Sequence, residues 1–133
     1  MRFFLDNCVS PKIARALAAL DARHSVVHLQ ERFSADVKDV AWICALRSEG
    51  EWIIVSGDPR IAHGKAEREA WKESKFTAFF LEDFSQRGFW VQAREVVKWW
   101  PDILEHARAA SPGTGYLIPF NAKRADKWKK IFA

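Results

Sequence analysis

The sequence predicts an α/β domain in three layers, with helices on both faces of a central, mostly parallel sheet of four or five strands. Short apolar runs alternate with segments of helical periodicity along the first 110 residues. Residues 52–55 are apolar on both faces, as is typical of a central strand in a parallel sheet. The chain has 133 residues, of which 49% are hydrophobic, and this fits one domain with a sizeable core.

The N-terminal third predicts two strands with a helix between them. Residues 2–5 form an apolar run that ends at Asp6. Ser10 followed by Pro11 is typical of a helix start, with Ser10 as the N-cap, and the apolar spacing continues to about residue 22. Residues 25–29 then predict the second strand.

The middle of the chain repeats this alternation. Asp36, followed three residues later by Asp39, predicts a helix N-terminus with Asp36 as the N-cap, and the helix runs to about residue 48. After the strand at residues 52–55, a polar segment of helical character leads to a fourth strand at residues 76–81. Helical spacing resumes at Phe89, and Pro101 predicts a break there into two abutting helices.

A linker is predicted where Ser-Pro-Gly-Thr-Gly occupies residues 111–115. It separates a domain at residues 1–110 from a C-terminal segment at 111–133, made of this linker and a basic, aromatic tail. The formal net charge is +4, and residues 123–133 carry all of that excess, so the body is neutral overall.

Lysines and aromatic residues interleave in the tail, which suits phosphate contact combined with base stacking. The alternative is an amphipathic helix that docks its rings on the body. The RNA-contact candidates in the tail are Lys123, Arg124, Lys127, Trp128, Lys129 and Lys130.

Cysteine content and hydropathy favour a soluble, cytoplasmic protein with reduced thiols and no membrane contact. Cys8 and Cys44 show no metal-binding spacing. The N-terminal segment has an acid where a signal peptide needs apolar residues, and no apolar run reaches the length of a membrane span.

Acidic side chains follow three of the predicted strands. Asp6, Asp58 and Asp83 come directly after strands, and Asp39 opens a helix. Ligands of parallel sheets bind outside the carboxyl ends of the strands, so these acids are expected at the binding edge. Because clustered carboxylates repel each other, a divalent cation among them is the natural explanation, and their hard oxygens suit Mg²⁺ or Mn²⁺. Magnesium sites of this kind favour phosphate-ester chemistry.

Three segments resemble the PIN-like ribonuclease superfamily, and within it the short toxins of the VapC type. They are Phe-Phe-Leu-Asp-Asn-Cys-Val-Ser-Pro at residues 3–11, Asp-Val-Ala-Trp at 39–42 and Trp-Ile-Ile-Val-Ser-Gly-Asp at 52–58. The resemblance covers roughly residues 2–84. It implies a PIN-like fold and a metal-dependent endoribonuclease in which Asp6, Asp39 and Asp58 are catalytic and bind Mg²⁺ or Mn²⁺. It also implies an RNA substrate, a cognate antitoxin protein and a homodimer.

The chain departs from that pattern at two places. Relatives often have Glu directly after the first Asp, where this chain has Asn7, and a further acid behind the third Asp, where it has Pro59 and Arg60. The accessory candidates are Asn7, Asp36, Asp83 and Ser56. Arg60 is a candidate for clamping an RNA phosphate.

Two other functions stay open at this point. A receiver-type domain would phosphorylate Asp58, but no Lys follows the strand at residues 76–81, and a pair of acids after the first strand is missing. A catalytically inactive PIN-like module would bind RNA or protein through its aromatic face and tail.

Overall fold

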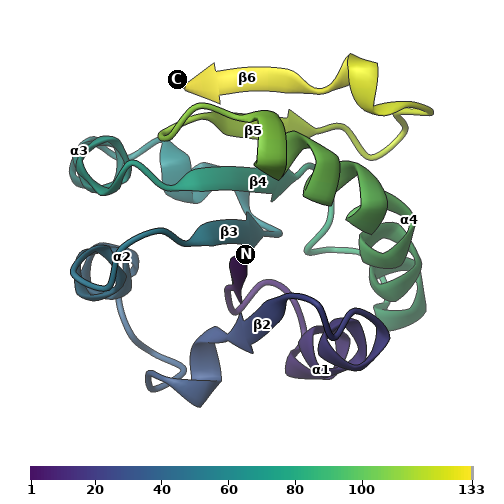
Figure 1. Cartoon of the computed structure of the whole chain (residues 1–133), viewed down its shortest axis with the longest axis horizontal. Coiled ribbons are helices and arrows are strands. Elements are labelled where there is room, and N and C mark those ends of the chain that lie inside the picture. The colour runs from purple at the N-terminus through teal and green to yellow at the C-terminus, as the bar shows by residue number, and fades with distance from the viewer. Residues whose placement is uncertain (133) are drawn as a thin grey trace.

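A computed structural model describes residues 1–132 and has the expected three-layer α/β/α architecture (Figure 1). The sheet order is β2-β1-β3-β4-β5-β6. The first five strands are parallel, and β6 runs antiparallel to β5. The α/β prediction is confirmed, with six strands instead of four or five because the C-terminal segment supplies two strands, β5 and β6.

The element bounds agree with the predicted alternation. The strands are β1 (Arg2–Leu5), β2 (Ser25–His28), β3 (Ile53–Ser56), β4 (Thr77–Leu81), β5 (Gly115–Ile118) and β6 (Lys129–Phe132). The α-helices are α1 (Pro11–Leu20), α2 (Asp39–Arg47), α3 (Lys65–Ser74) and α4 (Phe89–Ala109). Short 3₁₀ turns occupy Leu29–Glu31, Pro59–Ala62 and Ala125–Lys127.

The sheet separates two hydrophobic cores. Helices α1 and α4 cover one face, and α2 and α3 cover the other (Figure 1). Phe3 and Phe4 are both fully buried and belong to opposite cores, because neighbouring side chains of a strand point to opposite faces. Burial on both faces explains why the central strands are apolar throughout.

The two predicted helix starts differ in outcome. Ser10 caps α1 by accepting a hydrogen bond from the backbone N of Lys12 at 3.1 Å, as predicted. The prediction that Asp36 caps α2 is wrong, because α2 begins at Asp39 with Lys38 in the N-cap position. Asp36 instead accepts a hydrogen bond from the hydroxyl of Ser34 at 2.7 Å, in the turn before the helix.

Helix α4 passes through Pro101 without a break, so the predicted pair of abutting helices is wrong. Proline removes one backbone hydrogen bond and crowds the preceding turn. Trp99, Trp100 and Ile103 are buried on both sides of Pro101 and hold the helix against the sheet. Tertiary packing therefore offsets the local cost of the proline.

The C-terminal segment completes the sheet. Trp128 is 9% exposed and packs among Phe79, Trp99 and Tyr116, so its ring is not available to stack on a base. The tail docks its rings on the body, as the alternative expected, but it does so as strand β6 and not as an amphipathic helix. On the other face Phe132 stacks on Trp71. A Cβ at Gly115 would lie 2.5 Å from the Phe132 ring, so β6 can approach β5 this closely only beside a glycine.

No helix among residues 1–132 combines the length and apolar character needed to cross a membrane.

Docking of the tail predicts a large loss of stability when its anchor is truncated. Trp128→Ala removes a buried indole and should lower the free energy of unfolding by about 3 kcal/mol, measured by urea denaturation. The matched control is Lys127→Ala, next to it but exposed, which should change stability by no more than about 0.5 kcal/mol. Equal stabilities of the two variants would contradict the docking of the tail.

Candidate functional site

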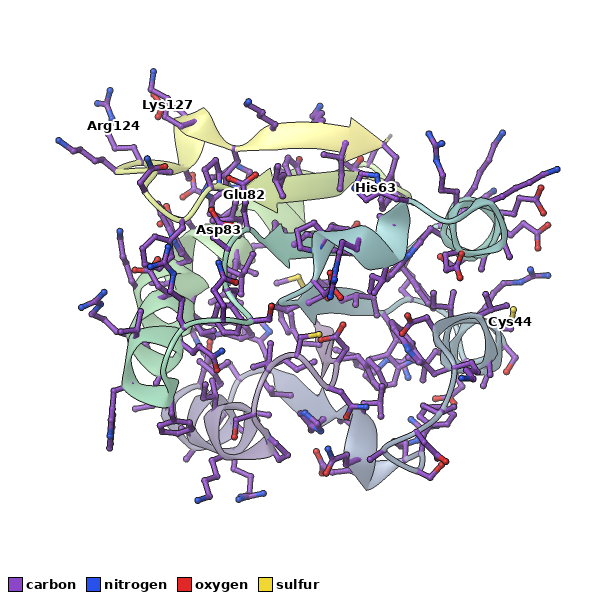
Figure 2. All side chains as sticks on the ribbon, turned by 180° about the vertical axis from the view of Figure 1, so that it is seen from behind. Cys44, His63, Glu82, Asp83, Arg124 and Lys127 are labelled. Atoms are coloured by element: carbon purple, nitrogen blue, oxygen red, sulfur yellow. The ribbon has the colours of Figure 1, made fainter. Side chains whose placement is uncertain are left out.

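The acids after β1, β3 and β4 lie at one edge of the sheet, as the parallel register requires. The strand order places β3 between β1 and β4. Asp6 is tied to the neighbouring strand by a hydrogen bond from its backbone N to the carbonyl of Val55 at 3.3 Å. Figure 2 views the molecule from behind and labels Glu82 and Asp83, which follow β4.

Asp6 is a buried carboxylate whose hydrogen-bond partners are all uncharged. Its side chain is 3% exposed. Oδ2 accepts a hydrogen bond from the Ser56 hydroxyl at 2.5 Å, and Oδ1 accepts one from the Cys8 backbone N at 3.1 Å. Burial, reinforced by the nearby charge of Asp39, raises the pKa of Asp6 to about 7, although hydrogen bonds from Ser56 and from the backbone of Cys8 and Gly57 oppose the rise.

Asp39 faces the same site from the first turn of α2. Its Oδ1 accepts a hydrogen bond from the Trp42 indole at 3.0 Å, which fixes the carboxylate near the helix start. Burial, together with the negative charges of Asp6, Asp58 and Asp39, raises the pKa of the Cys8 thiol to about 12. The charges of all three carboxylates therefore reach the Cys8 thiol, which stays protonated.

Asp58 is paired with Arg60. The Arg60 guanidinium donates to both carboxylate oxygens, at 2.8 Å from Nε to Oδ1 and 2.9 Å from Nη2 to Oδ2. These bonds hold the pKa of Asp58 below its usual range. The backbone N of Asp58 also donates to the Ser56 hydroxyl at 3.1 Å. Ser56 thus connects Asp58 to Asp6.

A pocket of about 320 Å³ lies between the turn after β3 and the loop after β4. It brings Asp83 to the same hollow as Asp58, together with Glu82 and His63. Asp83 has a φ of 53°, a left-handed conformation that Asp tolerates better than most residues. Glu82 and His63 are not recognisable as site residues from local sequence patterns, because only the fold brings residues 63 and 82 together.

The other candidates lie apart from this carboxylate group. Asn7 donates to the carbonyl of Ala35 at 2.6 Å and accepts from Gln30 at 3.0 Å, so it anchors the loop before α2. Asp36 is exposed and bonded to Ser34. The basic residues of the tail are exposed, whereas Trp128 is buried, and Figure 2 shows Arg124 and Lys127 projecting outward from the tail.

The donor set suits a hard cation held by few protein ligands. Within residues 1–132, no three His, Cys, Asp or Glu side chains are arranged to hold one ion. Magnesium, however, commonly binds one or two carboxylates and completes its shell with water and substrate phosphates. Asp6 supplies a buried carboxylate without a cationic partner, and Asp39 lies close enough for its charge to raise the pKa of Asp6. Asp58 is occupied by Arg60 in this arrangement.

Comparison with known proteins gives the family. The family model described as "PIN like domain" matches residues 1–83, which is more than half of the chain. The chain therefore belongs to the PIN-like domain family, and the matched region contains Asp6, Asp39 and Asp58. Searches of curated proteins and of solved structures found no match.

The raised pKa of Asp6 predicts a pH dependence of stability when divalent ions are chelated. The folded pKa of about 7 exceeds the ordinary value of 3.8, so the folded protein holds the proton more tightly than the unfolded chain. The contribution of Asp6 to the free energy of unfolding should be full below about pH 4. It should be lost as the pH rises to about 7, by about 1.4 kcal/mol for each unit of pKa difference. Urea denaturation from pH 4 to 8 measures this fall.

The matched control is Asp6→Asn, which keeps the shape and can still accept from Cys8. It should be more stable than the wild type at pH 8 and lack most of the decline. If the free energies of unfolding of the two proteins changed in parallel with pH, the burial of the Asp6 charge would not lower stability.

Proposed function

We propose that this PIN-like domain is a metal-dependent endoribonuclease with Asp6, Asp39 and Asp58 as its metal-binding and catalytic residues. The buried carboxylate of Asp6 carries the proposal. It has only uncharged hydrogen-bond partners. The charge of Asp39 raises the pKa of Asp6, and the charges of Asp39 and Asp58 both raise the pKa of Cys8. A divalent cation would supply the missing positive charge.

Mg²⁺ or Mn²⁺ held by these acids would acidify a water and stabilise negative charge on an RNA phosphate. The protein's own groups set up this site. Ser56 orients Asp6 through its hydroxyl, and the Trp42 indole orients Asp39. Both donors come from well-packed elements, which keeps the carboxylates in place without a ligand.

Arg60 has two roles in this proposal. Without a cation it neutralises Asp58 through two short hydrogen bonds. When a cation takes its place, the exposed guanidinium is free to bind a phosphate of the substrate, for which its planar pair of donors is suited. Asp58 therefore exchanges one positive partner for another.

The proposed partners follow from the resemblance and from the charge distribution. The substrate is RNA, with Lys123, Arg124 and Lys127 as backbone contacts outside the acidic pocket. Lys129 and Lys130, exposed on β6, extend this basic surface. As a toxin of a toxin–antitoxin pair, the protein would be held inactive by an antitoxin that covers the acids, and it would act as a homodimer.

The Arg60–Asp58 pair also favours a second candidate. With Asp58 neutralised and no preformed group of three metal ligands among the described residues, the domain could bind RNA or protein without cutting it. Metal dependence separates the two functions, because RNA binding by an inactive module persists in a chelator.

The direct test is cleavage of total cellular RNA by the purified protein, free of partners, in Mg²⁺ or Mn²⁺ and in chelator. Asp6→Asn, Asp39→Asn and Asp58→Asn should each lower the rate by about 100-fold or more, because each removes a charge that holds the ion. The triple variant, purified in parallel, reveals contaminating nuclease. Metal-dependent cleavage that is equal in wild type and triple variant would refute the assignment.

The competition at Asp58 predicts that removing Arg60 improves metal binding. In Arg60→Ala, Mn²⁺ should bind about two- to fivefold tighter, the range expected for an exposed ion pair, while KM for RNA rises. Isothermal titration with Mn²⁺ measures the first effect. Arg68→Ala, an exposed arginine on α3, is the matched control and should leave both constants unchanged. Weaker Mn²⁺ binding by Arg60→Ala would mean that Arg60 supports the ion instead of competing with it.

A further inference from the structure

A second cavity lies at the opposite edge of the sheet from the acids. Its volume is about 700 Å³, and its walls include the starts of β1, β3 and β4 and the end of α4. This is within the size range of pockets that hold small ligands. Nothing in the proposed nuclease site uses it.

Cationic side chains from three separate elements line this cavity. Arg2 begins β1, Lys75 follows α3, and Arg108 lies in the last turn of α4. None of the three forms an ion pair with any of residues 1–132, and Glu51 is the one acidic side chain in the lining. The cavity therefore has an excess of positive charge in a body that is neutral overall.

Arg2 is held in position before any ligand arrives. Its Nη2 donates to the carbonyls of Glu49 at 2.8 Å and Glu51 at 2.9 Å, and the guanidinium lies 4.4 Å from the centroid of the Trp52 ring. Nη1 and Nε have no partner within the described chain. An arginine fixed in this way loses little conformational entropy when it binds an anion.

Lys75 occupies an unusual backbone position. It ends α3 with a φ of 58°, in the left-handed region where glycine is the usual residue. A lysine in this conformation lowers stability relative to glycine, which favours a functional role for its side chain. Arg108 adds to the positive charge of the cavity. Burial lowers the pKa of His24, and the charge of Arg108 contributes to that shift.

Apolar side chains make up much of the remaining lining, among them Ile53, Ala107, Ala110 and Pro112. Cations combined with apolar side chains suit a ligand with a phosphate group and a flat or apolar body. We propose that this cavity is a binding site for a nucleotide phosphate, held by Arg2, Lys75 and Arg108. The phosphate comes from a free nucleotide or from the 5′ end of an RNA strand.

Isothermal titration without divalent ions tests this site apart from the acidic one, because uncompensated carboxylates repel phosphate. The probes are ATP, adenosine, and an RNA pentanucleotide with either a 5′-phosphate or a 5′-hydroxyl. ATP should bind and adenosine should bind at least about tenfold more weakly, since only the phosphates meet the cations. A 5′-phosphate that strengthens RNA binding by the same factor identifies RNA ends as ligands, and equal binding of the two RNAs leaves free nucleotides as the ligand.

Two variants remove a cation without disturbing the fold. Lys75→Gly relieves the left-handed backbone, so it should be at least as stable as the wild type while its affinity for ATP falls about tenfold. Arg108→Gln should lower the affinity for ATP to a similar extent. Lys72→Gln, an exposed lysine of α3 outside the cavity, should change nothing.

Two results would overturn the site. One is the absence of ATP binding by the wild type at concentrations up to about 1 mM, where even a weak nucleotide site would fill. The other is an affinity for ATP that Lys75→Gly and Arg108→Gln leave at the wild-type value. Neither result would bear on the acidic site, whose metal-dependent cleavage is measured separately.

Discussion

The burial of the Asp6 carboxylate is the constraint on which the candidate site depends. The residue is 3% exposed, and its carboxylate accepts hydrogen bonds from the Ser56 hydroxyl and the Cys8 backbone. Neutral hydrogen bonds do not replace the hydration of a full negative charge, so the charged form is costly and the pKa rises to about 7. At neutral pH the buried carboxylate of Asp6 lowers the stability of the fold unless a cation or a proton neutralises it.

The geometry around Asp6 explains how the other acids act with it. Ser56 ends β3, next to β1, and its hydroxyl contacts both Asp6 and the backbone of Asp58. Asp39 reaches the same region from α2 and is held by Trp42. Parallel strands therefore gather charges at one edge, and the internal pairing of Asp58 with Arg60 reduces the resulting repulsion. The opposite edge carries the reverse charge, with Arg2, Lys75 and Arg108 around the second cavity.

Much of the fold follows from local sequence signals. The Ser10-Pro11 helix start and the apolar strand before Ser56-Gly57-Asp58 are each determined by residues that are neighbours in the sequence. The structure agrees with both predictions. The errors arise where distant packing decides. Pro101 lies inside a helix because the buried tryptophans beside it hold that helix on the sheet. Trp128 is part of the core because β6 pairs with β5, a contact that the composition of the tail does not reveal. The Arg60–Asp58 pair and the approach of Glu82 and His63 to Asp58 also depend on turn geometry.

Anomalous X-ray scattering from crystals of the protein grown with MnCl₂ would locate the bound cation. We expect a manganese peak beside the carboxylates of Asp6 and Asp39, with the Arg60 guanidinium displaced from Asp58. Crystals of Asp6→Asn grown in the same way should lack the peak. Mn²⁺ bound at full occupancy elsewhere in the wild type, with none near Asp6, would refute the metal site, since the buried charge would then have no need of a cation.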